Sequence, residues 1–106
     1  MPTYKVLAQS APSATTATTL YTATNATIVS TLNASNIGGT QDTIRVAVRP
    51  AGAALANQHY IAYGVPLAAG AILSLQGGIT LANTDVITVY STTGNTSFSA
   101  FGSEGN

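Results

Sequence analysis

The chain has 106 residues, a length that suits one compact domain with a core of modest size. Charged residues make up 6% of the sequence, against about 25% in typical soluble domains, and three cations balance three anions. So few cations argue against nucleic acid as a partner, the absence of cysteine excludes disulfides and thiolate chemistry, and no apolar run is long enough to indicate a membrane span.

Eight short segments rich in β-branched residues predict β-strands, and no window carries the apolar three-and-four spacing of an amphipathic helix. In the clearest segment, 43–49, the side chains of Ile44, Val46 and Val48 point to one face. Pro50 cannot donate a backbone hydrogen bond and ends this strand. In chain order the predicted strands are 4–8, 19–22, 27–34, 43–49, 59–63, 71–75, 85–91 and 97–101.

Turn residues separate these segments at intervals of roughly 8 to 12 residues, as in small antiparallel sandwiches. We interpret Gly38 with Gly39, and Gly77 with Gly78, as hairpin turns. The pattern predicts an all-β fold of about eight short antiparallel strands in a β-sandwich, with a jelly-roll or an Ig-like Greek-key topology. Residues 1–106 are expected to form a single domain.

The start of the chain allows two interpretations. Within residues 1–18, the stretch 9–18 is rich in Ser, Ala, Thr and Pro and carries no strand pattern. It is either a surface loop or an arm that contacts a neighbouring subunit, with the loop favoured by composition. A strand edge near the termini can also extend a neighbour's sheet through backbone hydrogen bonds.

Side chains for catalysis or metal binding are scarce. His59 is the sole histidine, and a zinc site needs three or four ligands, for which only Asp42, Asp85 and Glu104 are at hand. These carboxylates stand singly, each beside a turn or a chain end, and Asp42 and Asp85 suit hydrogen bonding to turn backbone. No Gly-x-Ser-x-Gly elbow occurs. The sequence predicts no catalytic residue, no metal site, no cofactor and no enzyme activity.

A few residues are candidates for contact with other proteins. Arg45 and Arg49 share one strand face, where guanidinium groups suit bidentate contacts with carboxylates or sugars; a solvated outer face is the alternative. His59 is expected to be partly exposed at the start of a strand, and Tyr60 and Tyr63 to point to opposite faces of it. The interface candidates are Tyr4, Lys5, Arg45, Arg49, His59 and Tyr63.

Five segments together resemble the small virion structural proteins of tailed bacteriophages, of the kind that infect cyanobacteria and marine bacteria. These segments are YKVLAQSAP at 4–12, RVAVRPAG at 45–52, NQHYI at 57–61, TDVITVY at 84–90 and FSAFGSE at 98–104. The resemblance extends over nearly the whole chain. It implies assembly in the host cytoplasm and a final location in the virion.

The role that this resemblance implies is a capsid decoration or cement protein, which stabilises the head at junctions between coat subunits. Its partners would be the major capsid protein and copies of itself, with a trimer suited to a threefold site. Nucleic acid, membrane and small-molecule ligands are not expected. Two alternatives remain: a neck, tail or baseplate component, and a carbohydrate-binding module on the virion surface with Tyr63 near His59 as its site.

Overall fold

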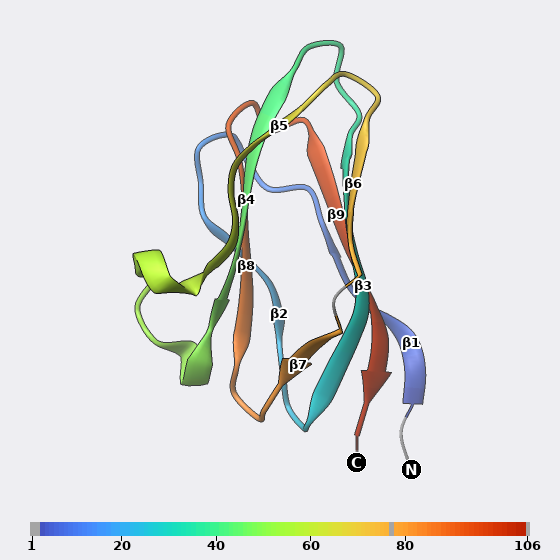
Figure 1. The fold of residues 1–106 in the computed structure, drawn as a ribbon, viewed down its shortest axis with the longest axis vertical. Coiled ribbons are helices and arrows are strands. Elements are labelled where there is room, and N and C mark those ends of the chain that lie inside the picture. Colours follow the sequence, from blue (N-terminus) through green and yellow to red (C-terminus); the bar gives the residue numbers. More distant parts are fainter. Residues whose placement is uncertain (1–2, 77, 106) are drawn as a thin grey trace.

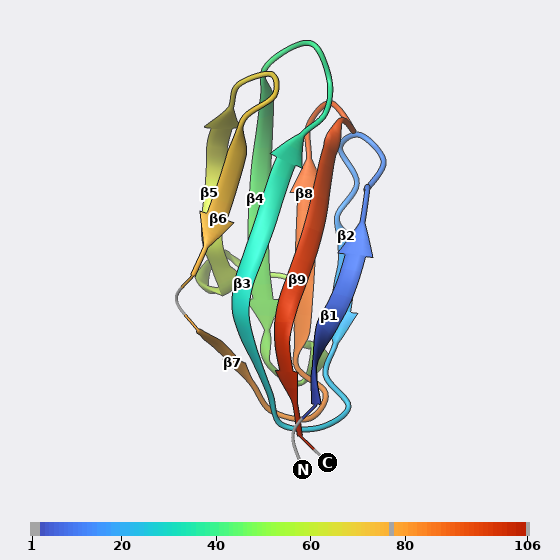
Figure 2. The same ribbon diagram turned by 90° about the vertical axis from the view of Figure 1, so that its right-hand side faces the viewer.

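The computed structural model describes residues 3–76 and 78–105, with the side chains of Thr3 and Tyr4 left outside that description. Within these residues nine strands form two antiparallel sheets that face each other (Figures 1 and 2). The molecule measures 42 × 27 × 20 Å. The prediction of an all-β sandwich is therefore confirmed.

The sandwich has a five-stranded and a four-stranded sheet. The five-stranded sheet runs in the order β1 (Thr3–Ser10), β9 (Thr96–Glu104), β3 (Thr27–Asn36) and β6 (Ile72–Leu75), and β7 (Ile79–Leu81) also pairs with β3. The four-stranded sheet runs in the order β2 (Thr18–Thr22), β8 (Val86–Ser91), β4 (Asp42–Arg49) and β5 (Tyr60–Leu67). Figure 2 shows the two layers one behind the other, with both termini at the same end.

The strand pairing is that of a long hairpin folded over on itself. β1 pairs with β9, β2 with β8, β3 with β6 and β7, and β4 with β5, so that the pairs are nested around the β4–β5 connection. Consecutive strands from β1 to β4 alternate between the two sheets. Such nesting produces the two Greek keys of a jelly roll. Of the two predicted topologies, the structure has the jelly roll.

The predicted hairpin turn at Gly38 and Gly39 is wrong. Gly38 lies in the connection between β3 and β4, which belong to different sheets. A Cβ on Gly38 would come within 2.6 Å of Asn95 Nδ2, so glycine permits two loops to touch there. Gly77 lies outside the described residues, and the strands on either side, β6 and β7, both pair with β3.

Most predicted strands are found, with three notable differences. β7 was missed because it is only three residues long, although its Leu81 belongs to the core. β1 continues through Ser10, two residues into the stretch that we expected to be a loop or an arm. β5 continues past Gly64 and Pro66, which is compatible with its position at the edge of a sheet.

The core lies between the sheets and follows the alternation of each strand. Phe98 and Leu32 from the five-stranded sheet face the four-stranded sheet, whose Ile44, Val46 and Ile87 point inward; all five are fully buried. The inward face predicted for the 43–49 segment is thus confirmed. Aliphatic side chains and one phenylalanine fill this core, so packing at their contacts provides most of the stability.

Candidate interaction surfaces

Asp42 begins β4 and is 1% exposed. Its carboxylate accepts hydrogen bonds from the backbone N–H groups of Thr43 (2.8 Å) and Thr93 (3.0 Å) and from the hydroxyls of Ser91 and Thr96. Burial alone would raise the pKa of Asp42, but these four hydrogen bonds outweigh it and lower the pKa to about 2. The ionised carboxylate ties β4 to the loop between β8 and β9.

Glu104 links the two sheets at the end of the molecule where the termini lie (Figure 2). Its Oε2 lies 2.8 Å from Lys5 Nζ, and the Tyr21 hydroxyl donates to Oε1 at 2.8 Å. The hydrogen bond with Lys5 is the main cause of the lowered pKa of Glu104, and the same bond raises the pKa of Lys5. Lys5, an expected interface residue, thus has an ionic partner within the chain.

Asp85 holds the long β4–β5 connection in place. Its two carboxylate oxygens accept hydrogen bonds from the backbone N–H groups of Ala51 and Ala82, each at 2.9 Å, and these bonds lower its pKa. All three acidic residues of the chain are therefore used within the fold. In residues 3–76 and 78–105, no group of three His, Cys, Asp or Glu side chains could hold a metal ion.

Arg45 lies on the outer face of the four-stranded sheet, between two tyrosines. Its Cζ is 4.5 Å from the ring centre of Tyr63 on β5 and 4.3 Å from that of Tyr90 on β8, the two strands that flank β4. Tyr60 meets Tyr63 edge to face, with ring centres 4.8 Å apart. Tyr63 is 59% exposed. We call these four residues, Arg45, Tyr60, Tyr63 and Tyr90, the Arg45 cluster.

Two irregularities of β5 bring the cluster together. In a regular strand Tyr60 and Tyr63 would point to opposite faces, as we predicted. The pairing of β5 with β4 instead skips Ile61 and Gly64, so that Tyr60 lies opposite Ala47 and Tyr63 opposite Arg45. Bulges of this kind redirect side chains. The prediction of opposite faces was wrong because the bulge inserts Ile61 as an extra residue between Tyr60 and Tyr63, so that both rings lie on the same face.

The connection between β4 and β5 covers the rest of this outer face. Arg49 Nε donates to Thr88 Oγ1 at 3.0 Å, and Arg49 Nη1 donates to the carbonyl of Ala53 at 3.1 Å. His59 is 8% exposed, and its Nδ1 accepts a hydrogen bond from the Ala56 N–H at 3.1 Å. Both residues were expected at an interface, but here they support the loop. His59 lies in a short 3-10 turn, Asn57–His59, rather than in a strand.

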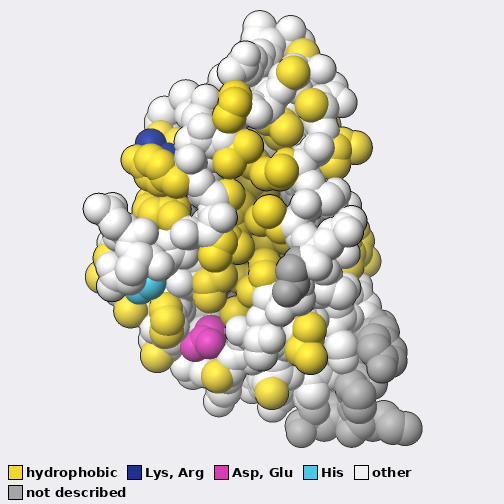
Figure 3. Space-filling model, in the orientation of Figure 1, with side chains coloured by type: hydrophobic (Ala, Val, Ile, Leu, Met, Phe, Trp, Pro, Cys, Tyr) yellow, Lys and Arg dark blue, Asp and Glu magenta, His cyan; other side chains and the backbone are white. Residues whose placement is uncertain are grey.

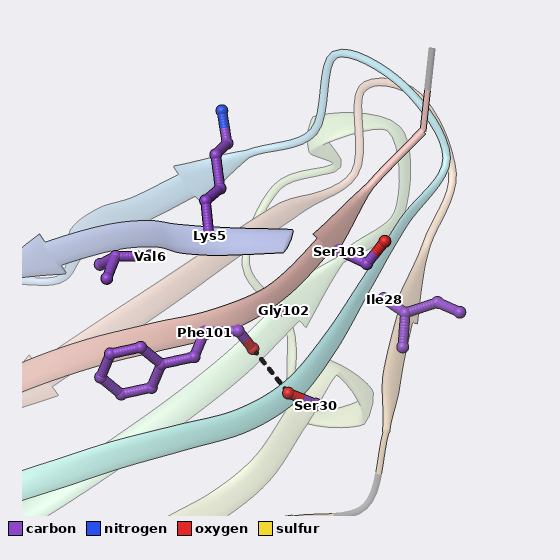
Figure 4. A pocket seen from close by; sticks show the side chains of 7 residues that line it. All are labelled: Lys5, Val6, Ile28, Ser30, Phe101, Gly102 and Ser103. Carbon is purple, nitrogen blue, oxygen red and sulfur yellow. Dashed lines mark hydrogen bonds between the residues drawn. The ribbon is translucent and has the colours of Figure 1, made fainter. Parts of the chain in front are cut away.

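A shallow groove of about 770 Å³ marks the outer face of the five-stranded sheet (Figure 4). Val6 from β1, Phe101 from β9 and Ile28 from β3 give it an apolar lining, and Val6 and Ile28 are each about half exposed. The Ser30 hydroxyl donates to the Phe101 carbonyl across the groove at 3.2 Å. Lys5 stands at its rim with its side chain directed away from Val6.

One side of the sandwich leaves core side chains partly open. Figure 3 shows a strip of hydrophobic side chains between the two sheets, on the side where β5 and β6 form the edges. We call this strip the seam. At the opposite side the edge strands β1 and β2 come close together. The half-buried apolar residues of the seam are Ala62, Val65, Ala71, Leu73, Leu75 and Ile79.

Sequence analysis identified part of these surfaces. Arg45 and Tyr63 were expected at an interface and lie together in the Arg45 cluster. Tyr4 lies on β1, but its side chain is outside the described residues. Tyr90 was missed, because its contact with Arg45 depends on the pairing of β8 with β4, strands far apart in the sequence. The alternation of β8 could have placed Tyr90 on an outer face.

In the part of the chain that the structure describes, no helix is long and apolar enough to cross a membrane. The chain was also compared with known proteins by sequence and by structure. No protein-family model matches it, and no curated protein or solved structure shows a significant similarity to it.

Proposed function

We propose that the chain is a structural protein of a tailed-phage virion, a capsid decoration or cement protein that binds at junctions between coat subunits. The proposal starts from the resemblance of the five segments to small virion proteins and from the low charge of the sequence. A neutral chain lacks the self-repulsion that keeps free proteins apart in solution. Such a composition favours a protein that functions inside a permanent assembly.

The observation that carries the proposal is the seam together with the groove. Both are apolar surfaces that the chain itself leaves uncovered. Contiguous apolar surface on a soluble protein marks a site of interaction. Repeated over many copies, even modest contacts of this kind add up to a stable attachment.

Three of the four sheet edges are poorly suited to this attachment. β1, β2 and β5 each contain an interruption of register, and β5 also carries Pro66, which cannot donate a backbone hydrogen bond. Such edges resist the addition of a further strand. We therefore expect the chain to attach through its sheet faces and the seam, and not by the extension of a neighbour's sheet near the termini.

The jelly-roll fold is compatible with this role. Jelly rolls occur in viral capsid proteins, in lectin domains and in enzymes, so function has to be argued from the surfaces. The three carboxylates and His59 are engaged separately in local hydrogen bonds, as described above. The seam and the groove are surfaces suited to contact with other proteins rather than to catalysis.

Copy number in purified particles tests the proposal. Quantitative mass spectrometry of virions, with the major capsid protein as internal standard, should give roughly as many copies as there are coat subunits, or a simple fraction of that number. A count of about six or twelve would place the chain in a neck, tail or baseplate ring. Absence from intact particles would contradict the proposal altogether.

A second candidate, carbohydrate binding at the virion surface, is favoured by one observation. Asn57, Tyr60 and Tyr63 line an open hollow of about 420 Å³ beside the Arg45 cluster. An exposed ring next to a side-chain amide is an arrangement that can hold a sugar. Binding of the chain to a glycan array, abolished by Tyr63→Ala, would support this second function; an array without binding would remove it.

A further inference from the structure

We infer that Arg45 marks a further contact surface, separate from the seam and the groove, and that it takes a carboxylate from a different protein. The inference rests on the proposed function and specifies the chemistry of one contact within it. It concerns the outer face of the four-stranded sheet, which lies on the other side of that sheet from the core.

The three cations of the chain differ in how they are satisfied. Lys5 pairs with Glu104, and Arg49 donates to Thr88 and Ala53. Arg45 has no hydrogen bond or ion pair with any described residue, and its Nε is the one buried side-chain nitrogen or oxygen in the described part of the chain that lacks a partner. A guanidinium offers five N–H donors, so Arg45 presents unused binding capacity.

The tyrosines restrict how a ligand can reach this guanidinium. Tyr63 and Tyr90 approach it from the two neighbouring strands, and its Nε is buried. The terminal nitrogens are left for a ligand that approaches from the solvent side. Two parallel N–H donors match the two oxygens of a carboxylate. Contact with the rings also limits the rotation of the side chain, so less entropy is lost on binding.

Charge complementarity indicates which molecule supplies the carboxylate that binds Arg45. The chain has three acidic residues, and Asp42, Asp85 and Glu104 all accept hydrogen bonds within the fold. A second copy would therefore have no free Asp or Glu to offer. A phosphate backbone would require several cations on one face, whereas the other two cations are engaged elsewhere. An acidic side chain of another protein remains as the partner.

The surroundings of Arg45 suit such a contact. Tyr63 and Tyr90 flank the guanidinium, Tyr60 packs against Tyr63, and the hollow that Asn57 lines together with Tyr60 and Tyr63 lies beside the guanidinium. Arginine and tyrosine are the residues most enriched at the energetic centre of protein interfaces, where surrounding groups exclude water from an ion pair. On binding, the ion pair would be shielded by these rings.

The first experiment measures binding of the purified full chain to particles that lack it. Wild type is expected to bind, and Arg45→Gln to bind at least about 10-fold more weakly, because a shielded charge would lose its partner. Arg49→Gln is the matched control, since Arg49 lies on the same strand but donates within the chain. Circular dichroism confirms that each variant is folded.

The outcomes separate the inference from the proposed function. Failure of wild type to bind particles would contradict the proposed function itself. Binding of wild type and Arg45→Gln with equal affinity would overturn the inference alone, as would equal losses in Arg45→Gln and Arg49→Gln. Self-association of the wild type that disappears in Arg45→Gln, seen by analytical ultracentrifugation, would also overturn it by making a second copy the partner.

A second experiment identifies the carboxylate. The Arg45→Lys variant keeps the positive charge and supplies an amine that a carbodiimide couples directly to an adjacent Asp or Glu. Bound particles treated in this way should yield a cross-linked peptide that joins position 45 to an acidic residue of another protein, detected by mass spectrometry. Wild type, with Lys5 as its sole lysine, is the control. A product that joins position 45 to this chain's own acids would contradict the inference.

Discussion

Two of the three charged side chains of β4, three residues apart, face opposite environments. Asp42 points inward, is almost fully buried and accepts four hydrogen bonds. Arg45 points outward, contacts two tyrosine rings and makes no hydrogen bond with any described residue. In a chain with so few charges, the satisfied group holds the fold together, and we propose that the unsatisfied group marks a surface for a partner.

The environments of the two groups explain this division of roles. The oxygen atoms of Asp42 are surrounded by hydroxyl and N–H donors from β4 and from the loop between β8 and β9, so removing the charge would leave those donors without an acceptor. Arg45 loses only ring contacts at a partly exposed site when it is replaced. Stability should depend strongly on the first residue and weakly on the second.

The largest effect is expected for Asp42→Asn. The side-chain amide has nearly the same shape but carries no charge, and its NH2 group replaces one of the two oxygens that accept hydrogen bonds here. We expect the free energy of unfolding at pH 7 to fall by about 3 kcal/mol, a typical cost of breaking a buried charged network. Urea denaturation measures it. A loss below about 1 kcal/mol would show that Asp42 does not hold this end of the molecule.

The second-largest effect is expected from pH, because the free energy of unfolding should decrease as Asp42 becomes protonated. Its pKa is about 2 in the folded protein and 3.8 without the fold, so the unfolded chain binds the proton more readily. The carboxylate therefore contributes about 2 kcal/mol above pH 5, a contribution that is lost as the pH falls through 4 to 2. Urea midpoints at pH 7, 4 and 2.5 follow this loss. Asp42→Asn should show a correspondingly smaller decrease over the same range.

A smaller loss is expected for Gly38→Ala, at the same end of the molecule. The added methyl group would lie 2.6 Å from Asn95 Nδ2 and 2.7 Å from Asn95 Cβ. The two loops must then move apart, at a cost of about 1.5 kcal/mol. Gly39→Ala is the matched control, because its added methyl group meets no atom within 4 Å. Equal thermal midpoints for the two variants would refute the close contact of these loops.

The smallest effect on stability is expected for Arg45→Gln. Contacts between an exposed cation and tyrosine rings are weak, and the substitution also removes a buried N–H without a partner. We expect the free energy of unfolding to change by less than about 1 kcal/mol, measured in urea beside Asp42→Asn. A loss as large as that of Asp42→Asn would mean that Arg45 serves the fold rather than a partner.

The environment of Arg45 could be predicted from the sequence better than that of Asp42. Alternation along 43–49 placed Arg45 on the outer face correctly, because a strand of a sandwich must direct its aliphatic side chains inward. The buried position of Asp42 depends on hydroxyls of Ser91 and Thr96, which only the folded chain brings near. The predicted acceptance of backbone hydrogen bonds by Asp42 is confirmed for the N–H groups of Thr43 and Thr93.

Elsewhere in the fold, too, contacts between distant parts of the sequence could not be predicted from local patterns. Strand segments could be recognised from β-branched residues, whereas their nested order depends on pairings such as β1 with β9 across almost the whole chain. The contact of Tyr60 with Tyr63 depends on a bulge at Ile61, which no local sequence pattern predicts. Composition predicted that the protein would need partners, while the location of the Arg45 cluster required the structure.

Hydroxyl-radical footprinting of intact particles tests the central claim most directly. Tyr63 is 59% exposed in the free chain and should be oxidised readily there. If the Arg45 cluster contacts a partner in the particle, oxidation of Tyr63 should fall at least several-fold there and return to the level of the free chain after dissociation. Equal oxidation of Tyr63 in particles and in the free chain would contradict the account.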